Sequence, residues 1–240
     1  MTLLFMHITK TAGGSLKDAL RRSGEDIIFH YPGEQGFNMN LAYERKPKIL
    51  FGHYVFGAHK AVNVEPRYAC FLREPIARTI SHFHHLRNND RSAIGDKTRE
   101  FERIEEYLNT AKHWEFDNFL CRVISGVANK ARYGEAGRNV YSAARENLYK
   151  YFEYIGIFED MTSSLDRLRN IVPNLPADIG SVNKGAYERE IPQETLKIVR
   201  EFNVFDQLLY QDAIDLLGAR KIADKSEIEL GDNNVIEASE

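Results

Sequence analysis

The sequence predicts an α/β protein with a central parallel β-sheet flanked by helices, for three reasons. Short apolar runs typical of buried strands alternate with segments of helical spacing along most of the chain. Two of these strands, at 3–8 and 68–72, run into a polar turn and then a helix. The run at 68–72 is apolar at every position, as expected for a strand covered on both faces of a parallel sheet.

The expected elements follow from apolar periodicity. The expected strands are 3–8, 26–29, 48–53, 68–72 and 154–158. The first helix carries Leu16, Ala19 and Leu20 on one face and ends before Gly24. Further helices are expected at 76–86, 141–152, 193–202 and 206–217, with helical segments between 99 and 152 and through 165–171. Residues 31–47 are polar and turn-rich.

A chain of 240 residues with 43% hydrophobic content is long enough to bury a sizeable core. We expect a single domain over residues 1–218. Residues 219–240 are acidic and weakly periodic, which predicts a flexible tail, with a short docked strand around Ile228 and Leu230 as the alternative.

The charge balance restricts the partners. A net charge of -3 argues against a general nucleic-acid binder, which normally carries a large basic excess. Any anion binding must therefore be local. The two cysteines, Cys70 and Cys121, are too few for a disulfide scaffold and lack metal-ligand spacing, so we expect buried free thiols.

The amino terminus has no basic region followed by a separate apolar segment and cleavage site. No apolar run approaches the roughly 20 residues needed to cross a bilayer. A cytoplasmic protein is the simplest prediction, unless the sequence is a fragment of a longer anchored protein.

The first strand runs into a glycine-rich turn, Lys10-Thr11-Ala12-Gly13-Gly14-Ser15, and then a helix. This layout is typical of phosphate binding, because glycines let the backbone approach an anion and the amino terminus of the helix attracts it. Lys10 adds a mobile positive charge. The alternative is an ordinary strand-to-helix turn with Ser15 as the helix N-cap.

The turn does not fit the nucleotide triphosphatase pattern. That pattern places a lysine directly before Ser or Thr after the last glycine, whereas here Gly14 precedes Ser15 and Lys10 lies before the glycines. The second apolar strand ends in Arg73-Glu74 and supplies no magnesium-binding aspartate. A metal-assisted kinase or ATPase is therefore disfavoured.

The second turn supplies Arg73, and Ser81 follows eight residues later on the next helix. An arginine at a strand end presents a bidentate fork to a phosphate, and a hydroxyl two helical turns along adds a donor. Taken alone, such an arginine is more often a salt-bridge partner. Together with the first turn, it suggests a ligand with two separated phosphate-like groups.

Two motifs resemble those of the carbohydrate sulfotransferases related to heparan sulfate 2-O-sulfotransferase. Residues 7–16, His-Ile-Thr-Lys-Thr-Ala-Gly-Gly-Ser-Leu, resemble the family's 5′-phosphosulfate loop, with Thr9 and Ala12 as mild departures. Residues 71–83, Phe-Leu-Arg-Glu-Pro-Ile-Ala-Arg-Thr-Ile-Ser-His-Phe, are similar to its 3′-phosphate segment. Residues 154–159 resemble a late family strand, and 182–185 resemble the loop that closes over the nucleotide.

The resemblance implies a P-loop-like sulfotransferase fold and transfer of a sulfuryl group from 3′-phosphoadenosine 5′-phosphosulfate (PAPS) to a hydroxyl, most often on a sugar. It implies that the donor is bound by the residues Lys10, Thr11, Ala12, Gly13, Gly14, Ser15, Leu16, Arg73, Ser81, Asn183 and Lys184. Lys10 would also stabilise charge during transfer. The sulfuryl group carries a single charge, so no metal is required on that ground.

The resemblance also implies a histidine base. The family carries a histidine after a glycine at the end of the third strand, which corresponds to His53, and neutral imidazole suits base work near neutral pH. The alternative is a loop histidine bonded to backbone. The close 2-O-sulfotransferases have another histidine where this sequence has Phe51, which puts their particular substrate in doubt. His59 is the second candidate base or an acceptor contact.

Three further histidines, His82, His84 and His85, follow Ser81. His82 and His85 at i, i+3 could hold zinc in principle, but no carboxylate or cysteine completes the set at a recognisable spacing. We expect them to line the acceptor cleft or pack on the surface, and we expect no metal site.

Two other functions stay open at this point. One is an ATP-dependent small-molecule kinase, which lacks the expected lysine and strand-end aspartate. The other is a non-catalytic relative that binds an anionic glycan, against which Lys10, Arg73, Ser81 and His53 argue. The acceptor and the oligomeric state are not predicted.

Overall fold

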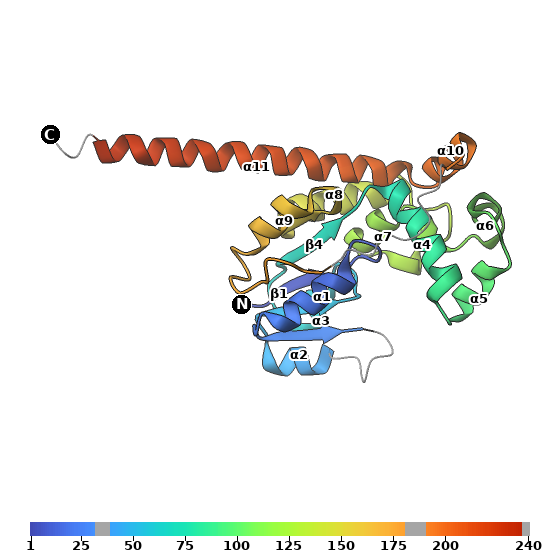
Figure 1. Ribbon diagram of the computed structural model, residues 1–240, viewed down its shortest axis with the longest axis horizontal. Helices are drawn as coiled ribbons and strands as arrows, with labels where there is room; N and C mark the ends of the chain where they lie inside the picture. The colour runs from blue at the N-terminus through green and yellow to red at the C-terminus, as the bar shows by residue number, and fades with distance from the viewer. Residues whose placement is uncertain (32–38, 181–190, 237–240) are drawn as a thin grey trace.

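The structure is a computed structural model, and it describes residues 1–31, 39–180 and 191–236. Its centre is a five-stranded sheet in the order β2-β3-β1-β4-β5, in which every neighbouring pair is parallel. The strands are β1 (Leu3–Met6), β2 (Ile27–His30), β3 (Ile49–Gly52), β4 (Tyr68–Leu72) and β5 (Phe152–Ile157). The predicted α/β class with a central parallel sheet flanked by helices is confirmed (Figure 1).

Helices cover the sheet and extend beyond it. The α-helices are α1 (Gly13–Arg22), α2 (Met39–Arg45), α3 (Ala58–Val62), α4 (Pro75–Asn89), α5 (Ala93–Arg99), α6 (Ile104–Ala111), α7 (Phe119–Ser125), α8 (Arg138–Tyr151), α9 (Met161–Leu168), α10 (Gln193–Glu201) and α11 (Val204–Ile236). Three short 3₁₀ helices are η1 (Trp114–Phe116), η2 (Ala128–Lys130) and η3 (Phe158–Asp160).

The central strand β1 supplies side chains to two core layers because successive residues of a strand face opposite sides. Leu4 and Met6 pack in the layer that contains residues of α7, α8 and α11. Leu3 and Phe5 pack in the opposite layer, against α1 and α9. All four side chains are buried, so the sheet is held from both faces.

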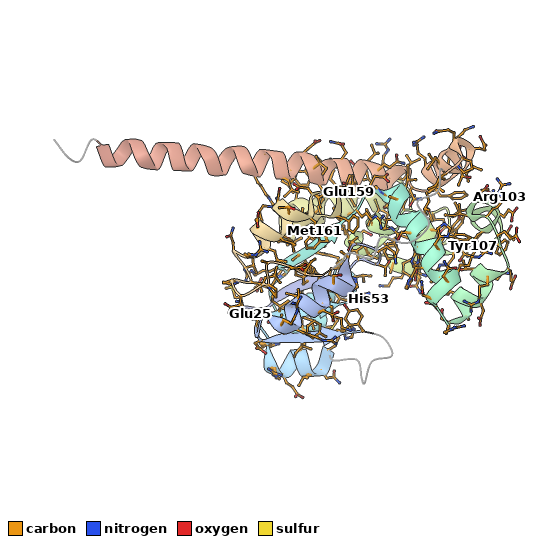
Figure 2. The ribbon with its side chains drawn as sticks, viewed as in Figure 1. Glu25, His53, Arg103, Tyr107, Glu159 and Met161 are labelled. Carbon is orange, nitrogen blue, oxygen red and sulfur yellow. The ribbon has the colours of Figure 1, made fainter. Side chains whose placement is uncertain are left out.

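A third core cluster joins α4 to α6, η1 and α10. Phe83 of α4, Tyr107 of α6 and Phe116 of η1 are buried in it. In Figure 2, His53 lies beside α1, and Tyr107 lies in the group formed by α4, α5 and α6. Because α4 follows directly after β4, this helical group stands at the carboxyl end of the sheet.

Several boundaries differ from the predictions. The stretch predicted as turn-rich contains α2, whose one fully buried residue is Ala42, so no apolar periodicity marks it. The five-residue α3 was also not predicted. The helix expected at 141–152 is α8, which begins at Arg138 and passes without a loop into β5 at Phe152.

The carboxyl-terminal helix is longer than predicted. We expected a helix over 206–217, and α11 runs from Val204 to Ile236. It therefore includes most of the predicted tail at 219–240, whose flexibility stays a prediction. Both cysteines are buried free thiols, as expected. Among the described residues, no helix has the length and apolar character to span a bilayer.

Candidate functional site

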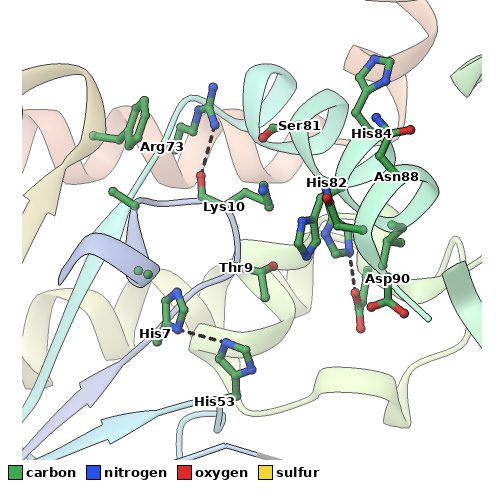
Figure 3. A pocket seen from close by; sticks show the side chains of 18 of the residues that line it. His7, Thr9, Lys10, His53, Arg73, Ser81, His82, His84, Asn88 and Asp90 are labelled. Carbon is green, nitrogen blue, oxygen red and sulfur yellow. Dashed lines mark hydrogen bonds and ion pairs between the residues drawn. The ribbon is translucent and has the colours of Figure 1, made fainter. Parts of the chain in front are cut away.

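The candidate site lies at the carboxyl ends of three adjacent strands. Met6 of β1 pairs with Gly52 of β3 on one side and with Cys70 of β4 on the other, so the residues that follow these strands emerge at one edge of the sheet. In parallel sheets with flanking helices, ligands bind at this edge. A cavity of about 820 Å³ opens there (Figure 3), and its lining includes His7, Lys10, His53 and Arg73.

The turn after β1 has a tight backbone conformation. Lys10 and Ala12 both adopt positive φ angles, 71° and 66°. The hydroxyl of Thr11 donates to the carbonyl of Ile8 at 2.8 Å and so closes the turn from inside. This conformation aims the amino terminus of α1 at the cavity, where Gly13 and Gly14 are among the lining residues.

The first amides of α1 are suited to an anion. Those of Gly13 and Gly14 have no acceptor within the helix, because an α-helix leaves its first N–H groups unpaired internally. The N-cap is Ala12, without a side-chain cap, so the N-cap role expected for Ser15 in the alternative reading is wrong. The amide of Leu16 already donates to the carbonyl of Ala12 at 3.1 Å, which removes it from ligand binding.

The turn after β4 fixes Arg73. Its Nη1 donates to the carbonyl of Lys10 at 3.2 Å, and its guanidinium carbon lies 4.4 Å from the centre of the Phe158 ring. The buried Nε of Arg73 has no hydrogen-bond partner in the part of the chain that the structure describes. A buried donor without a partner is costly, so this N–H is suited to an anionic ligand.

The helix that follows Arg73 is firmly capped. The carboxylate of Glu74 accepts from the amide of Ile76 at 3.1 Å and from that of Ala77 at 2.7 Å, and Pro75 occupies the first turn. This start places Ser81 two turns along α4, where it lines the same cavity as Arg73.

Positive charge is concentrated at Lys10. Burial lowers the pKa of its ammonium group, and the nearby guanidinium groups of Arg73 and Arg78 lower it further. Arg78 is fully buried behind the turn and donates from Nη2 to the carbonyl of Glu115 at 2.9 Å. Its burial lowers its own pKa to about 10. Three cationic side chains in so small a region are stable together when an anion balances them.

A pair of histidines borders the cavity beside this positive end. His53 follows β3 and His7 follows β1, and Nε2 of His53 lies 3.0 Å from Nδ1 of His7. The same Nδ1 of His7 lies 2.8 Å from the hydroxyl of Tyr31, which follows β2. Burial, with smaller contributions from the charges of His53, Lys17 and Lys10, lowers the pKa of His7 to about 3.

The opposite wall of the cavity comes from α4, the segment after it, and η1. The side chains that form it are His82, His84, His85, Asn88, Asn89, Asp90 and Glu115. Nε2 of His82 lies 2.6 Å from Oε2 of Glu115, and burial lowers the pKa of His82 to about 4. This wall is therefore polar, with neutral imidazoles and two carboxylates, in contrast to the positive end.

The structure brings together most of the predicted site. The predicted residues that line the cavity are Lys10, Ala12, Gly13, Gly14, Ser15, His53, Arg73 and Ser81. The side chains of Thr11 and Leu16 are buried under the turn and do not line it. Asn183 and Lys184 lie outside the described residues.

His59 is not at this edge and is not among the residues that line the cavity. It lies in α3, and its Nδ1 is 2.8 Å from the hydroxyl of Tyr68, the first residue of β4. The histidines predicted for the acceptor cleft, His82, His84 and His85, do line the cavity. Among the described residues, no group of three or more His, Cys, Asp or Glu side chains is placed to hold a metal ion.

Sequence reasoning gave no role to several residues that build the site. His7 directly follows β1, and Tyr31 directly follows β2. Their position at the carboxyl edge of the sheet was the signal that could have found them. Phe158 follows β5 in the same way. Glu115 lies in η1, far from any motif, and no pattern in the sequence marks it.

The fold and the cavity together define an α/β protein with a cavity at the carboxyl edge of a parallel sheet, and one end of this cavity is lined by Lys10 and Arg73. No family model matches the sequence, and no curated protein matches it. Among solved structures, the chain is similar to mouse sulfotransferase SULT7A1 complexed with PAP, at 14% sequence identity and a TM-score of 0.45. The match covers 86% of this chain and 64% of that chain, so the present chain spans less than two thirds of its length.

Proposed function

We propose that this protein transfers a sulfuryl group from PAPS to a hydroxyl of a carbohydrate. The observation that carries the proposal is the convergence of two separate anion-binding turns on one cavity. Lys10 and the amino terminus of α1 form one, and Arg73 with Ser81 forms the other. A ligand with two separated phosphate-like groups matches this arrangement, and PAPS has a 5′-phosphosulfate and a 3′-phosphate.

Each end of the donor has suitable partners. For the 3′-phosphate, Arg73 offers a charged fork that includes its buried, unpartnered Nε, and Ser81 adds a hydroxyl. For the 5′-phosphosulfate, Lys10 supplies charge, and Gly13 and Gly14 supply backbone N–H groups at a helix amino terminus. By the sequence resemblance, Asn183 and Lys184 would close over the nucleotide.

The chemistry follows from these positions. The acceptor oxygen forms a bond to sulfur while the bond between sulfur and the bridging phosphate oxygen breaks, and 3′-phosphoadenosine 5′-phosphate (PAP) leaves. Lys10 stabilises the charge that develops on the bridging oxygen. His53 takes the proton of the acceptor hydroxyl, because it lines the same cavity and its neighbour His7 is a neutral imidazole.

The polar wall supports a carbohydrate acceptor. Asn88, Asp90 and His84 present donors and acceptors on one side of the cavity, which suits a ligand with many hydroxyls. Its carboxylates disfavour a densely anionic polymer. We therefore propose a neutral or weakly charged sugar as the acceptor. Such a sugar needs no basic protein surface, which is consistent with the net charge of -3.

The first experiment measures PAP binding by titration calorimetry, with adenosine 5′-diphosphate as the control ligand that lacks a 3′-phosphate. We expect PAP to bind more tightly than the diphosphate, and Arg73→Ala to remove that difference. Arg67→Ala is the matched control, because Arg67 flanks the other end of β4 and pairs with Glu153 at the surface. A folded protein that binds PAP no better than adenosine diphosphate would overturn the proposal.

The second experiment tests turnover. Labelled PAPS is incubated with a panel of glycans and small alcohols, and release of PAP is followed together with label in the acceptor. We expect transfer to at least one sugar hydroxyl without added metal. Preferred binding of ATP with magnesium and transfer of a phosphoryl group instead would favour the kinase alternative.

A further inference from the structure

Glu115 presents a carboxylate to the cavity from η1, a short 3₁₀ helix outside every motif of the sequence. Its side chain keeps 21% of its surface exposed there. Nη2 of Arg78 donates to the backbone carbonyl of Glu115 at 2.9 Å, and the next residue, Phe116, is fully buried. The backbone of η1 is therefore held in place, and the carboxylate of Glu115 reaches the cavity from a fixed point.

One oxygen of this carboxylate is held by His82. Oε2 of Glu115 lies 2.6 Å from Nε2 of His82, whose side chain is only 4% exposed. The ring of His82 packs against that of Phe116, with centroids 5.1 Å apart. In Figure 3, His82 lies on the side of the cavity formed by α4, away from His53. Glu115 is therefore fixed on the polar wall and not beside the candidate base.

The pair of Glu115 and His82 carries one negative charge at neutral pH. Burial raises the pKa of the Glu115 carboxyl, but the hydrogen bond from His82 and nearby charges, Arg78 among them, lower it further, so the net shift is downward. Burial lowers the pKa of His82 to about 4, so this imidazole is neutral. An ionised carboxylate can only accept, so Nε2 of His82 carries the proton that the two residues share.

The second oxygen of Glu115 is open. Within the described part of the chain, no hydrogen bond reaches Oε1, and Oε1 is not one of the buried polar atoms without a partner there. A carboxylate oxygen has lone pairs for more than one donor. Glu115 thus offers the cavity a charged hydrogen-bond acceptor whose position is set by His82.

The charge of this oxygen indicates what it binds. An anionic donor is repelled by a carboxylate, so the ligand of Oε1 belongs to the acceptor molecule. A sugar hydroxyl is a suitable donor, because a hydrogen bond to an ionised oxygen is roughly twice as strong as one between neutral groups. The neutral imidazole of His82 leaves the full charge of Glu115 available for this bond.

Building on the proposed function, we propose that Glu115 is a specificity-determining residue that accepts a hydrogen bond at Oε1 from a hydroxyl of the acceptor sugar other than the one that is sulfated. His82 is its positioning residue, because the hydrogen bond to Oε2 directs Oε1 into the cavity. The polar wall thereby selects a sugar by a hydroxyl that takes no part in the reaction.

Glu115→Gln is the decisive variant, because His82 orients the new amide. The N–H of His82 takes the amide oxygen, so the NH₂ group occupies the place of Oε1. The open atom then changes from an acceptor to a donor with little change of shape. Glu105→Gln is the matched control, since Glu105 accepts from the hydroxyl of Thr195 at 3.2 Å and does not line the cavity.

The probes are the methyl glycosides of glucose, galactose and N-acetylglucosamine, with monodeoxy derivatives that each lack one hydroxyl. At saturating PAPS, Glu115→Gln should raise the KM for the sugar about tenfold, because a hydrogen bond to a charged group is lost. Its kcat and PAP affinity should stay near the wild-type values, and Glu105→Gln should behave as the wild type. Removal of the recognised hydroxyl should raise the KM of the wild type by a similar factor and that of Glu115→Gln little.

Two variants of His82 test how Glu115 is held. His82→Gln retains a donor for Oε2 and should leave the KM for the sugar near the wild-type value. His82→Phe retains a ring against Phe116 but lacks the donor, so it should raise the KM by less than Glu115→Gln does. His82→Phe also provides a second route if Glu115→Gln fails to fold.

The outcomes separate this inference from the function on which it rests. In Glu115→Gln, a fall in kcat at unchanged KM would overturn the proposal, and so would a loss of PAP affinity. A wild-type KM in both Glu115→Gln and His82→Phe would also overturn it. A wild-type protein that neither binds PAP nor turns over PAPS would overturn the proposed function instead. Saturation-transfer NMR of the three glycosides with the free protein would then still compare the wild type with Glu115→Gln.

Discussion

Gly13 faces the imidazole of His7 so closely that a β-carbon at position 13 would overlap that ring. The backbone of Gly13 does not need a positive φ, so conformational freedom is not what the glycine provides. At the next position the space is open, and a β-carbon on Gly14 would meet no atom within 4 Å. The two adjacent glycines of the turn therefore have different roles, and the first one makes room for His7.

Gly13→Ala should destabilise the protein by about 1–3 kcal/mol, because an overpacked side chain forces its neighbours to move. Gly14→Ala should be neutral or slightly stabilising, since alanine has the higher helix propensity in the first turn of α1. Urea unfolding followed by circular dichroism measures both free energies of unfolding.

The cause of the Gly13→Ala effect can be tested with a double-mutant cycle. In a His7→Ala background the overlapping ring is gone, so the added methyl group should have little effect and the coupling should be about 1–3 kcal/mol. Equal destabilisation in both backgrounds would show that the clash with His7 is not the cause.

Removal of the His82 imidazole should flatten the dependence of stability on pH. Burial lowers the pKa of His82 in the folded protein to about 4 from 6.5, so the unfolded chain binds more protons between these values. Stability is therefore lost as the pH falls from about 6.5 to about 4. One pKa unit corresponds to about 1.4 kcal/mol, which makes the expected loss on the order of 3 kcal/mol.

The comparison uses His82→Gln, whose amide can still donate to Glu115. The difference in unfolding free energy between wild type and variant should shrink as the pH falls through this window. Burial raises the pKa of Asp206 to about 6, so the effect of Asp206 on stability changes with pH in the opposite sense. Both proteins contain Asp206, so its effect cancels in the difference between them. A difference that stays constant from pH 7 to pH 4.5 would contradict the assignment.

The strands and the two polar turns that follow β1 and β4 were predictable because both depend on local signals. The apolar run of β4 and the capped start of α4 are contained within a few residues, and the structure places them at Tyr68–Leu72 and Pro75. The parallel direction of β1 and β4 then follows from the alternation of strands with helices, and with it the position of both turns at the carboxyl edge of the sheet.

The histidine cluster and the far wall could not be predicted in the same way. Contact of His7 with His53 depends on which strands are neighbours, and the role of Glu115 depends on how η1 packs against α4. His59, the second candidate base or acceptor contact, lies instead in α3, which carries it to the start of β4. Spacing along the chain does not determine such tertiary contacts.

Arg73→Lys should weaken PAP binding although the charge is kept. The planar guanidinium lies over Phe158 and offers several fixed donors, whereas a lysine ammonium group is a flexible point charge. We expect about a tenfold loss of affinity, equivalent to about one charge-assisted hydrogen bond. Calorimetry measures it, and an affinity for adenosine diphosphate that stays constant localises the loss to the 3′-phosphate.

Lys10 should set the alkaline limit of PAP binding. Burial and the charges of Arg73 and Arg78 lower the pKa of Lys10, so in the free protein its positive charge is lost at a lower pH than that of an ordinary lysine. Because an anion prefers the protonated form, PAP affinity should fall as the pH rises through that lowered pKa.

Lys10→Arg isolates this effect, because a guanidinium group keeps its charge throughout the alkaline range. We expect its PAP affinity to be lower than that of the wild type at neutral pH, since the side-chain geometry changes, but nearly constant from pH 7.5 to pH 10. Lys10→Met should bind PAP weakly at every pH. Calorimetric titrations at several pH values measure all three proteins, and an equal alkaline decline in the wild type and in Lys10→Arg would assign the limit to a group other than Lys10.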